Sequence, residues 1–178
     1  MSIRLRHGAM LLVCTAVLSV GPGCADMKPR KPEALRVEPP PPKPPMDPIE
    51  KRKRYAMAYE RGLALADQRE YGVAVGYLEQ AVELSPDSTE ALLALGACYE
   101  QMGDPLRAIR VYRQVLERDP DDIDALTNLG TSYVKLYHRE RNKLWLQLAR
   151  DTWRRALEVR PNQRDVQVFL AELEGRDP

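Results

Sequence analysis

The sequence contains little of what catalytic and metal sites are usually built from. Among its 178 residues are two histidines, His7 and His138, and no serine or cysteine stands in a nucleophile motif with a histidine to activate it. There is no phosphate-binding glycine loop, no zinc-protease motif and no stripe of aromatic and basic residues suited to nucleic acid bases. We therefore expect no enzyme activity, no metal, no cofactor, and neither nucleic acid nor a small-molecule substrate as partner.

Cysteine is also scarce, and the three cysteines of the chain do not indicate a disulfide. Cys14 lies in an apolar run, residues 9–20, that follows a basic start. The run is too short for a membrane-spanning helix, which needs ~20 residues, and is typical of a secretory signal peptide that is removed. Of the two remaining cysteines, Cys98 stands in an apolar segment with no histidine nearby, which indicates a buried core residue.

Cys24 follows small residues directly after the apolar run, in the stretch VGPGCADM. This arrangement resembles a bacterial lipobox, in which the cysteine is acylated and becomes the mature N-terminus, although Gly21 and Pro22 differ from its usual residues. The resemblance implies a signal peptide over residues 1–23 and a lipid anchor at Cys24. Ordinary signal cleavage or a retained anchor is the alternative. Because Ala25, and not aspartate, follows the cysteine, we expect the outer membrane, facing the periplasm, rather than the inner membrane.

Residues 24–54 are predicted to form an extended tether. Nine of the fifteen prolines lie within residues 29–48, a composition that favours a stiff extended chain over a packed core. At ~3.1 Å per residue, residues 25–50 would reach on the order of 80 Å. Its PxxP spacing is also found in ligands of proline-recognising domains, and its final KRKR run could bind anionic surfaces. We interpret the first as a spacer and the second as a solvated junction.

From Tyr55 onward the chain repeats itself with a period of 34 residues. The period is marked by three glycines and by pairs of alanines and prolines: Gly62, Gly96 and Gly130; Ala74 and Ala108; Pro86 and Pro120. This pattern resembles the tetratricopeptide repeat, and the resemblance implies an all-α fold, a right-handed superhelical solenoid of three helix pairs with a capping helix. The expected units are repeats over 55–88, 89–122 and 123–163, followed by the cap and tail over 164–178.

The third repeat departs from this period. Gly130 and Ala149 are 19 residues apart, where the corresponding distance in the first two repeats is 12, so the third carries seven extra residues. Because seven residues make about two helical turns, we expect an elongated helical hairpin. Trp145 is expected to pack on Tyr137 inside it or, with Leu144, to form a knob that binds a partner.

In the family that the repeat resembles, the first helix of each pair lines the concave side of the solenoid. Carried over to this sequence, the expected groove residues are Tyr59, Leu63, Leu93, Ala97, Glu100, Thr127, Thr131 and Lys135. A clamp for chaperone tails is not expected, because Tyr59 and Leu63 stand where that clamp has lysine and asparagine.

The resemblance therefore implies a non-enzymatic adaptor or scaffold of the cell envelope that binds a peptide or protein. Lipid-anchored proteins of this class include pilotins, which help assemble type IV pilus secretins, and adaptors that dock peptidoglycan enzymes. The alternative is a structural subunit that stacks with other subunits of an envelope complex and has no groove ligand.

Overall fold

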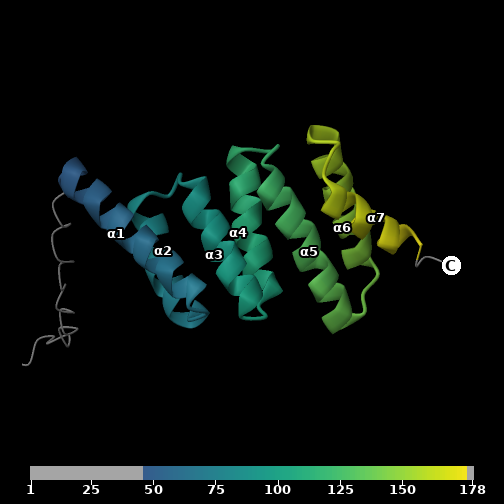
Figure 1. Cartoon of the computed structure of the whole chain (residues 1–178), viewed down its shortest axis with the longest axis horizontal. Coiled ribbons are helices and arrows are strands. Elements are labelled where there is room, and N and C mark those ends of the chain that lie inside the picture. Colours follow the sequence, from purple (N-terminus) through teal and green to yellow (C-terminus); the bar gives the residue numbers. More distant parts are fainter. Residues whose placement is uncertain (1–45, 176–178) are drawn as a thin grey trace, which may run out of the picture. The chain divides into compact units, whose positions relative to one another are not determined.

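The computed structural model describes residues 46–175, and within them every regular element is a helix. The predicted signal peptide, Cys24 and most of the predicted tether lie outside the described residues. Seven helices follow in order: α1 (Pro48–Asp67), α2 (Tyr71–Leu84), α3 (Thr89–Gln101), α4 (Pro105–Arg118), α5 (Ile123–Glu140), α6 (Leu144–Val159) and α7 (Arg164–Glu174). Each contacts the next, and α1 contacts α3 as α3 contacts α5 (Figure 1). The predicted solenoid of three helix pairs with a final helix is confirmed.

The first helix begins earlier than the sequence analysis places it. Residues 48–54, assigned there to the tether, form the start of α1. Pro48 occupies the first turn of the helix, where its missing N–H costs nothing and its fixed φ angle suits a helix. One turn on, Arg54 Nε lies 2.7 Å from Glu50 Oε1, an i,i+4 pair that supports the helix. The KRKR run is therefore an exposed part of α1.

Polar side chains cap three of the helices at the residue directly before each helix begins. The side chains of Ser88, Asp104 and Asp122 accept hydrogen bonds from backbone N–H groups at the starts of α3, α4 and α5. The distance from Ala125 N to Asp122 Oδ1 is 2.7 Å. The acidic segment before α5 thus satisfies backbone donors that would otherwise be unpaired.

The two helices of each pair approach closely at the repeated glycines. A Cβ atom added to Gly96 would lie 2.5 Å from Cε1 of Tyr112 on α4, and Tyr112 is fully buried. Gly130 meets the ring of Trp153 on α6 in the same way. Gly62 meets Leu78 of α2 in the first pair, so the glycine period marks the places where a large side chain of the second helix lies against the backbone of the first.

The seven extra residues of the third repeat lengthen its helices. The helix α5 has 18 residues where α3 has 13, and α6 has 16 where α4 has 14. The connections between the helices of the second and third pairs have the same length, so the whole insertion is helical. The predicted elongated hairpin is confirmed.

Trp145 does not pack on Tyr137 in this hairpin, so that expectation is wrong. Its ring stacks on Tyr133, one turn earlier in α5, with 5.9 Å between the ring centres. Spacing alone does not set the rotation of the ring, which is held by a 3.0 Å hydrogen bond from Trp145 Nε1 to Glu140 Oε2. Tyr137 lies against His138 instead.

The final helix covers the exposed side of the third pair. Val166 and Leu173 of α7 are 2% and 5% exposed, and Phe169 stacks on Trp153 with 5.3 Å between ring centres. An ion pair of 2.9 Å between Arg154 and Glu174 joins α6 to the end of α7. The predicted capping role of this segment follows from these contacts. None of the helices in residues 46–175 combines the length and apolar character that crossing a membrane requires.

Candidate functional site

The predicted groove residues lie on α1, α3 and α5, the first helices of the three pairs, which are neighbours in the stack. We call the surface made by these eight side chains the first-helix face: Tyr59, Leu63, Leu93, Ala97, Glu100, Thr127, Thr131 and Lys135. They differ in what they offer to a partner, because some are exposed and others are engaged within the protein.

The apolar part of the first-helix face comes from α1 and α3. Leu63 is 37% exposed and Ala97 is exposed, while Tyr59 and Leu93 are half-buried and pack against the core. The Tyr59 ring stacks on Tyr55, with 5.9 Å between ring centres, and burial raises the pKa of its hydroxyl. These side chains provide an apolar strip with a fixed aromatic ring at one end.

Glu100 is held inside the protein and does not project from the face. Its side chain is 9% exposed, and Oε1 accepts a 2.6 Å hydrogen bond from the hydroxyl of buried Ser132 and lies 3.3 Å from Lys135 Nζ. The Tyr112 hydroxyl donates to Oε2 at 3.5 Å, and burial raises the pKa of Tyr112, which keeps it protonated. Glu100 and Lys135 are therefore brought together, but as a pair that links α3 to α5.

The sequence analysis did not identify Ser132 and Tyr112 as parts of this cluster. A signal for Ser132 was present, because it is a polar residue among apolar neighbours on α5. A fully buried hydroxyl needs a hydrogen-bond partner. The structure shows that the partner is the carboxylate of Glu100, one repeat earlier.

The two threonines of α5 connect the face to α7. The Thr131 hydroxyl donates to the Thr127 carbonyl at 3.1 Å within the helix, and the Thr127 hydroxyl donates to Gln163 Oε1 at 3.5 Å. A cavity of about 360 Å³ lies between the starts of α5 and α7 beside these residues. On α7, Val168 follows Thr127 by 41 residues, one period plus the insertion, and is 47% exposed. The repeat period therefore extends the face to α7, a contribution that the sequence analysis missed.

The remaining predicted site residues are placed apart from this face. Leu144 is 51% exposed at the start of α6, whereas Trp145 is half-buried on Tyr133. Cys98 is 2% exposed, and burial raises the pKa of its thiol, which disfavours a reactive thiolate. Cys24 lies outside the described residues. Residues 46–175 contain no group of three or more His, Cys, Asp or Glu side chains that could hold a metal ion.

Two larger cavities of the described chain open at other places. One of about 730 Å³ lies between α4, α5 and α6. Another, of about 690 Å³, lies beside α1 and α2 and is lined by Met57, Tyr77 and neighbouring residues. Met57 is 70% exposed and Val73, also on this side of α2, is 53% exposed. An apolar surface thus remains uncovered at the end of the stack opposite α7.

Comparison with protein families supports the resemblance seen in the repeat. The family model for the tetratricopeptide repeat matches residues 59–123 and 99–136. The matched residues include the three repeated glycines and helices α2, α3 and α4, together with parts of α1 and α5. No curated protein shows significant sequence similarity to the chain.

Solved structures of tetratricopeptide repeat proteins share the fold at low sequence identity. The first repeat domain of Spaghetti (RPAP3), bound to an HSP90 peptide, is 15% identical with a TM-score of 0.62, over 69% of this chain and 92% of that one. The Arabidopsis OM64 domain is 16% identical with a TM-score of 0.63, over 71% and 99%. YrrB, described as having an unusual peptide-binding site, is 26% identical with a TM-score of 0.57, over 66% and 57%. The fold of this chain is thus that of a tetratricopeptide repeat solenoid.

Proposed function

We propose that this protein is a non-enzymatic adaptor that binds a peptide or protein partner on the first-helix face. The observation that carries the proposal is the apolar strip of Tyr59, Leu63, Leu93 and Ala97 on α1 and α3, beside which Glu100 and Lys135 are paired with each other. Such a strip suits an extended or helical segment with apolar anchors. The fold supports the same reading, because two similar domains are described in complex with HSP90 and HSP70 peptides.

The partner is expected to differ from those chaperone tails. Tyr59 and Leu63 are apolar where the family's clamp for a terminal carboxylate has lysine and asparagine. Lys135, the cation that the face retains, is already paired with Glu100 at 3.3 Å. A partner that relies on apolar side chains therefore fits this surface better than one that relies on a free carboxylate.

We further propose that the adaptor acts at the bacterial cell envelope, anchored by acylated Cys24 to the outer membrane and facing the periplasm. The apolar run before Cys24 and the proline-rich residues after it support this placement. In this position the protein would assist the assembly of an envelope complex, as pilotins or peptidoglycan-enzyme adaptors do. Mass spectrometry of the mature N-terminus tests the anchor, because an unmodified Cys24 or a different start would exclude it.

A second candidate is a structural subunit that stacks on another subunit through the uncovered end formed by α1 and α2. The exposure of Met57 and Val73 favours it, since apolar surface of this kind is usually covered. This candidate differs from the adaptor in the surface it uses, so substitutions on the two surfaces separate them.

The test compares three variants in crosslinking and pull-down from intact envelopes. We expect Leu93→Asp and Leu63→Asp to lose the partner while the helical circular dichroism is kept, because a carboxylate would be buried in the apolar contact. Leu63→Asp is included because Leu63 is the more exposed of the two and its replacement disturbs the core less. Val73→Asp makes the same chemical change on α2 and should leave binding intact. Loss of the partner in Val73→Asp alone would favour the stacking subunit and contradict the adaptor.

A further inference from the structure

The cavity of about 730 Å³ between α4, α5 and α6 lies on another side of the solenoid from the first-helix face. On α5 the cavity is lined by Leu126, Leu129 and Tyr133, whose i, i+3, i+7 spacing places them on one side of the helix. Thr127 and Thr131 of the first-helix face follow a different stripe, roughly opposite on the same helix. A partner in this cavity would therefore not compete directly for the apolar strip of α1 and α3.

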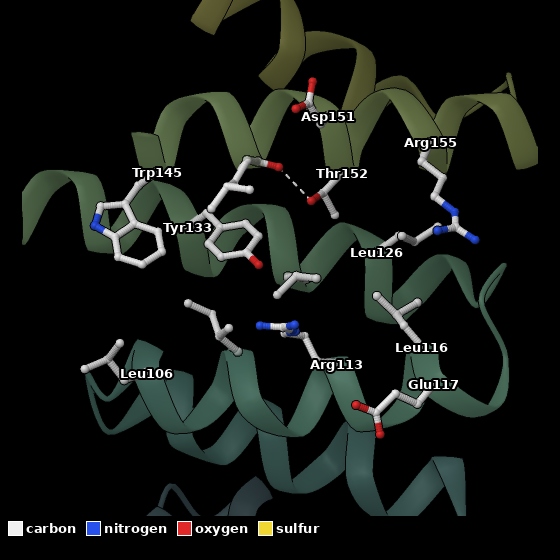
Figure 2. A pocket seen from close by; sticks show the side chains of 13 residues that line it. Leu106, Arg113, Leu116, Glu117, Leu126, Tyr133, Trp145, Asp151, Thr152 and Arg155 are labelled. Atoms are coloured by element: carbon white, nitrogen blue, oxygen red, sulfur yellow. Dashed lines mark hydrogen bonds between the residues drawn. The ribbon is translucent and has the colours of Figure 1, made fainter. Parts of the chain in front are cut away.

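The walls of the cavity, on the two second helices, combine apolar side chains with charged and polar ones. The apolar ones include Leu106 and Leu116 on α4 and Trp145 on α6 (Figure 2). Leu148 of α6 also lines the cavity. From Leu106 to Leu116 the wall runs ten residues along α4, about 15 Å at the helical rise. An open trough of this length suits an extended or helical segment better than a compact small molecule.

Four charged side chains line this trough, Arg113, Glu117, Asp151 and Arg155, and Arg113 is the one on which the inference rests. Figure 2 shows it extending from α4 into the space between α4 and α6, with Asp151 pointing away on the far side of α6. Asp151 is paired with Arg154 at 3.8 Å, and Arg155 is paired with Asp121 at 3.4 Å. Within residues 46–175 no hydrogen bond or ion pair joins Arg113 to any other group, Glu117 of the same trough included.

The corresponding residues one repeat earlier, where α2, α3 and α4 meet, form a hydrogen bond of their own; we call each such meeting of three helices a junction. Glu79 and Tyr99 precede Arg113 and Tyr133 by one period of 34 residues. There the Tyr99 hydroxyl donates to Glu79 Oε1 at 2.5 Å, and Arg107 covers the ring of Tyr99 at 4.6 Å from its centre. Burial and the hydrogen bond to Glu79 raise the pKa of Tyr99 to about 12, so it remains a donor. This junction supplies its own carboxylate.

The second junction lacks that carboxylate. Arg113 replaces Glu79, and within the described chain the Tyr133 hydroxyl has no hydrogen-bond partner. When the seven-residue insertion is counted, Leu148 corresponds to Arg107, and Trp145 corresponds to Asp104, the ion-pair partner of Arg107. Burial raises the pKa of Tyr133, which the charge of Arg113 partly offsets, so the hydroxyl stays protonated beside the cation. The Arg113 guanidinium and the Tyr133 hydroxyl are therefore two donors of one trough for which no acceptor is found within residues 46–175.

We propose that the trough between α4 and α6 binds a segment of a partner protein in which one Asp or Glu stands among apolar residues. Its carboxylate accepts hydrogen bonds from the Arg113 guanidinium and the Tyr133 hydroxyl, as Glu79 accepts one from Tyr99. Its apolar side chains lie on Leu106, Leu116 and Trp145. Arginine suits this role because its planar group binds a carboxylate with two parallel hydrogen bonds.

The experiment uses random linear peptides displayed on phage, first depleted on the full chain carrying Arg113→Glu and then selected on the full wild-type chain. We expect the selected peptides to share an acidic residue flanked by apolar ones. Exchanging that residue for its amide should weaken binding by about tenfold or more, measured by fluorescence anisotropy. Arg113→Glu should have the same effect, and Tyr133→Phe should weaken binding about fivefold.

Two controls keep the outcome specific. Arg52→Glu makes the same change of charge at an exposed position of α1, and Leu63→Asp alters the first-helix face, so both should bind the selected peptides as the wild type does. Arg113→Glu should melt no lower than the wild type, because the introduced carboxylate can accept from Tyr133 as Glu79 does from Tyr99. The proposal is wrong if no peptide is selected, if acidic residues are not enriched, or if Leu63→Asp abolishes binding of the selected peptides.

Discussion

The same substitution, glycine to alanine, is expected to act in opposite directions at two helix positions of this protein. At Gly76, in the interior of α2, an added Cβ meets no atom within 4 Å. Alanine there reduces the entropy of the unfolded chain and is the better helix former, so Gly76→Ala should raise the free energy of unfolding by about 0.5–1 kcal/mol.

At Gly96 the same change forces a collision. The new Cβ would lie 2.5, 2.8 and 2.9 Å from three carbons of the Tyr112 ring. That ring is rigid, fully buried and linked through its hydroxyl to Glu100, so it cannot rotate away. Overpacking of a core costs about 1–3 kcal/mol. After subtraction of the gain in helix propensity, Gly96→Ala should lower the free energy of unfolding by about 1–2 kcal/mol.

Urea denaturation of the purified chain, followed by far-ultraviolet circular dichroism, measures both values. For a folded part of this size, 1 kcal/mol corresponds to a melting shift of roughly 3–5 °C, so thermal melts should rank Gly76→Ala, wild type and Gly96→Ala in that order. If Gly96→Ala were as stable as Gly76→Ala, the close contact between α3 and α4 would not be as the structure has it, and the packing role of the glycine period would be refuted.

Two further outcomes follow from the structure. Truncation after Pro161 removes α7 and with it the burial of Val166 and Leu173, a loss of about 3–6 kcal/mol, so the third repeat should unfold; an unchanged melting curve would contradict the capping role. The side-chain hydrogen bond from Arg107 holds the pKa of Asp104 below its usual value. The Asp104 carboxylate therefore stabilises the fold fully above its unfolded-state pKa of roughly 4. This stabilisation is lost as the pH falls through the lower pKa of the folded state. Asp104→Asn should therefore be less stable than the wild type at neutral pH and equal to it in strong acid, and a difference that persists in acid would show that charge is not its cause.

Much of the fold could be predicted because its signals are local. The 34-residue period, the glycines and the helix-capping residues Asp104 and Asp122 act over a few turns of chain, and the structure has helix pairs and caps where they indicate. The seven-residue insertion was readable as two helical turns for the same reason. The start of α1 was placed too late because the proline-rich composition extends into its first turn, where Pro48 is compatible with helix.

The side-chain partners of the candidate sites could not be predicted in this way. Glu100 was predicted to contact a partner because its repeat position belongs to the first-helix face. A carboxylate that is buried must instead be hydrogen-bonded or paired within the protein. Two of its donors, Ser132 and Lys135, come from the next repeat. The sequence analysis placed Trp145 on Tyr137, one helical turn from Tyr133, on which it stacks. Residue spacing within one helix does not determine how a ring is rotated toward the other helix of the pair.

The repeat, the number of helix pairs and the places where helices approach closely can be predicted from the sequence, because each depends on residue spacing along one chain. Which charged side chains are paired depends on the tertiary structure. Arg113 and Glu79 occupy the same position of the repeat, yet Glu79 receives the hydroxyl of Tyr99 and Arg113 receives no acceptor within the described residues. The exchange of glutamate for arginine is visible in the sequence. That Tyr99 meets Glu79, and that Tyr133 lies beside Arg113, is set by the packing of one repeat on the next, because residue spacing does not specify distances between repeats.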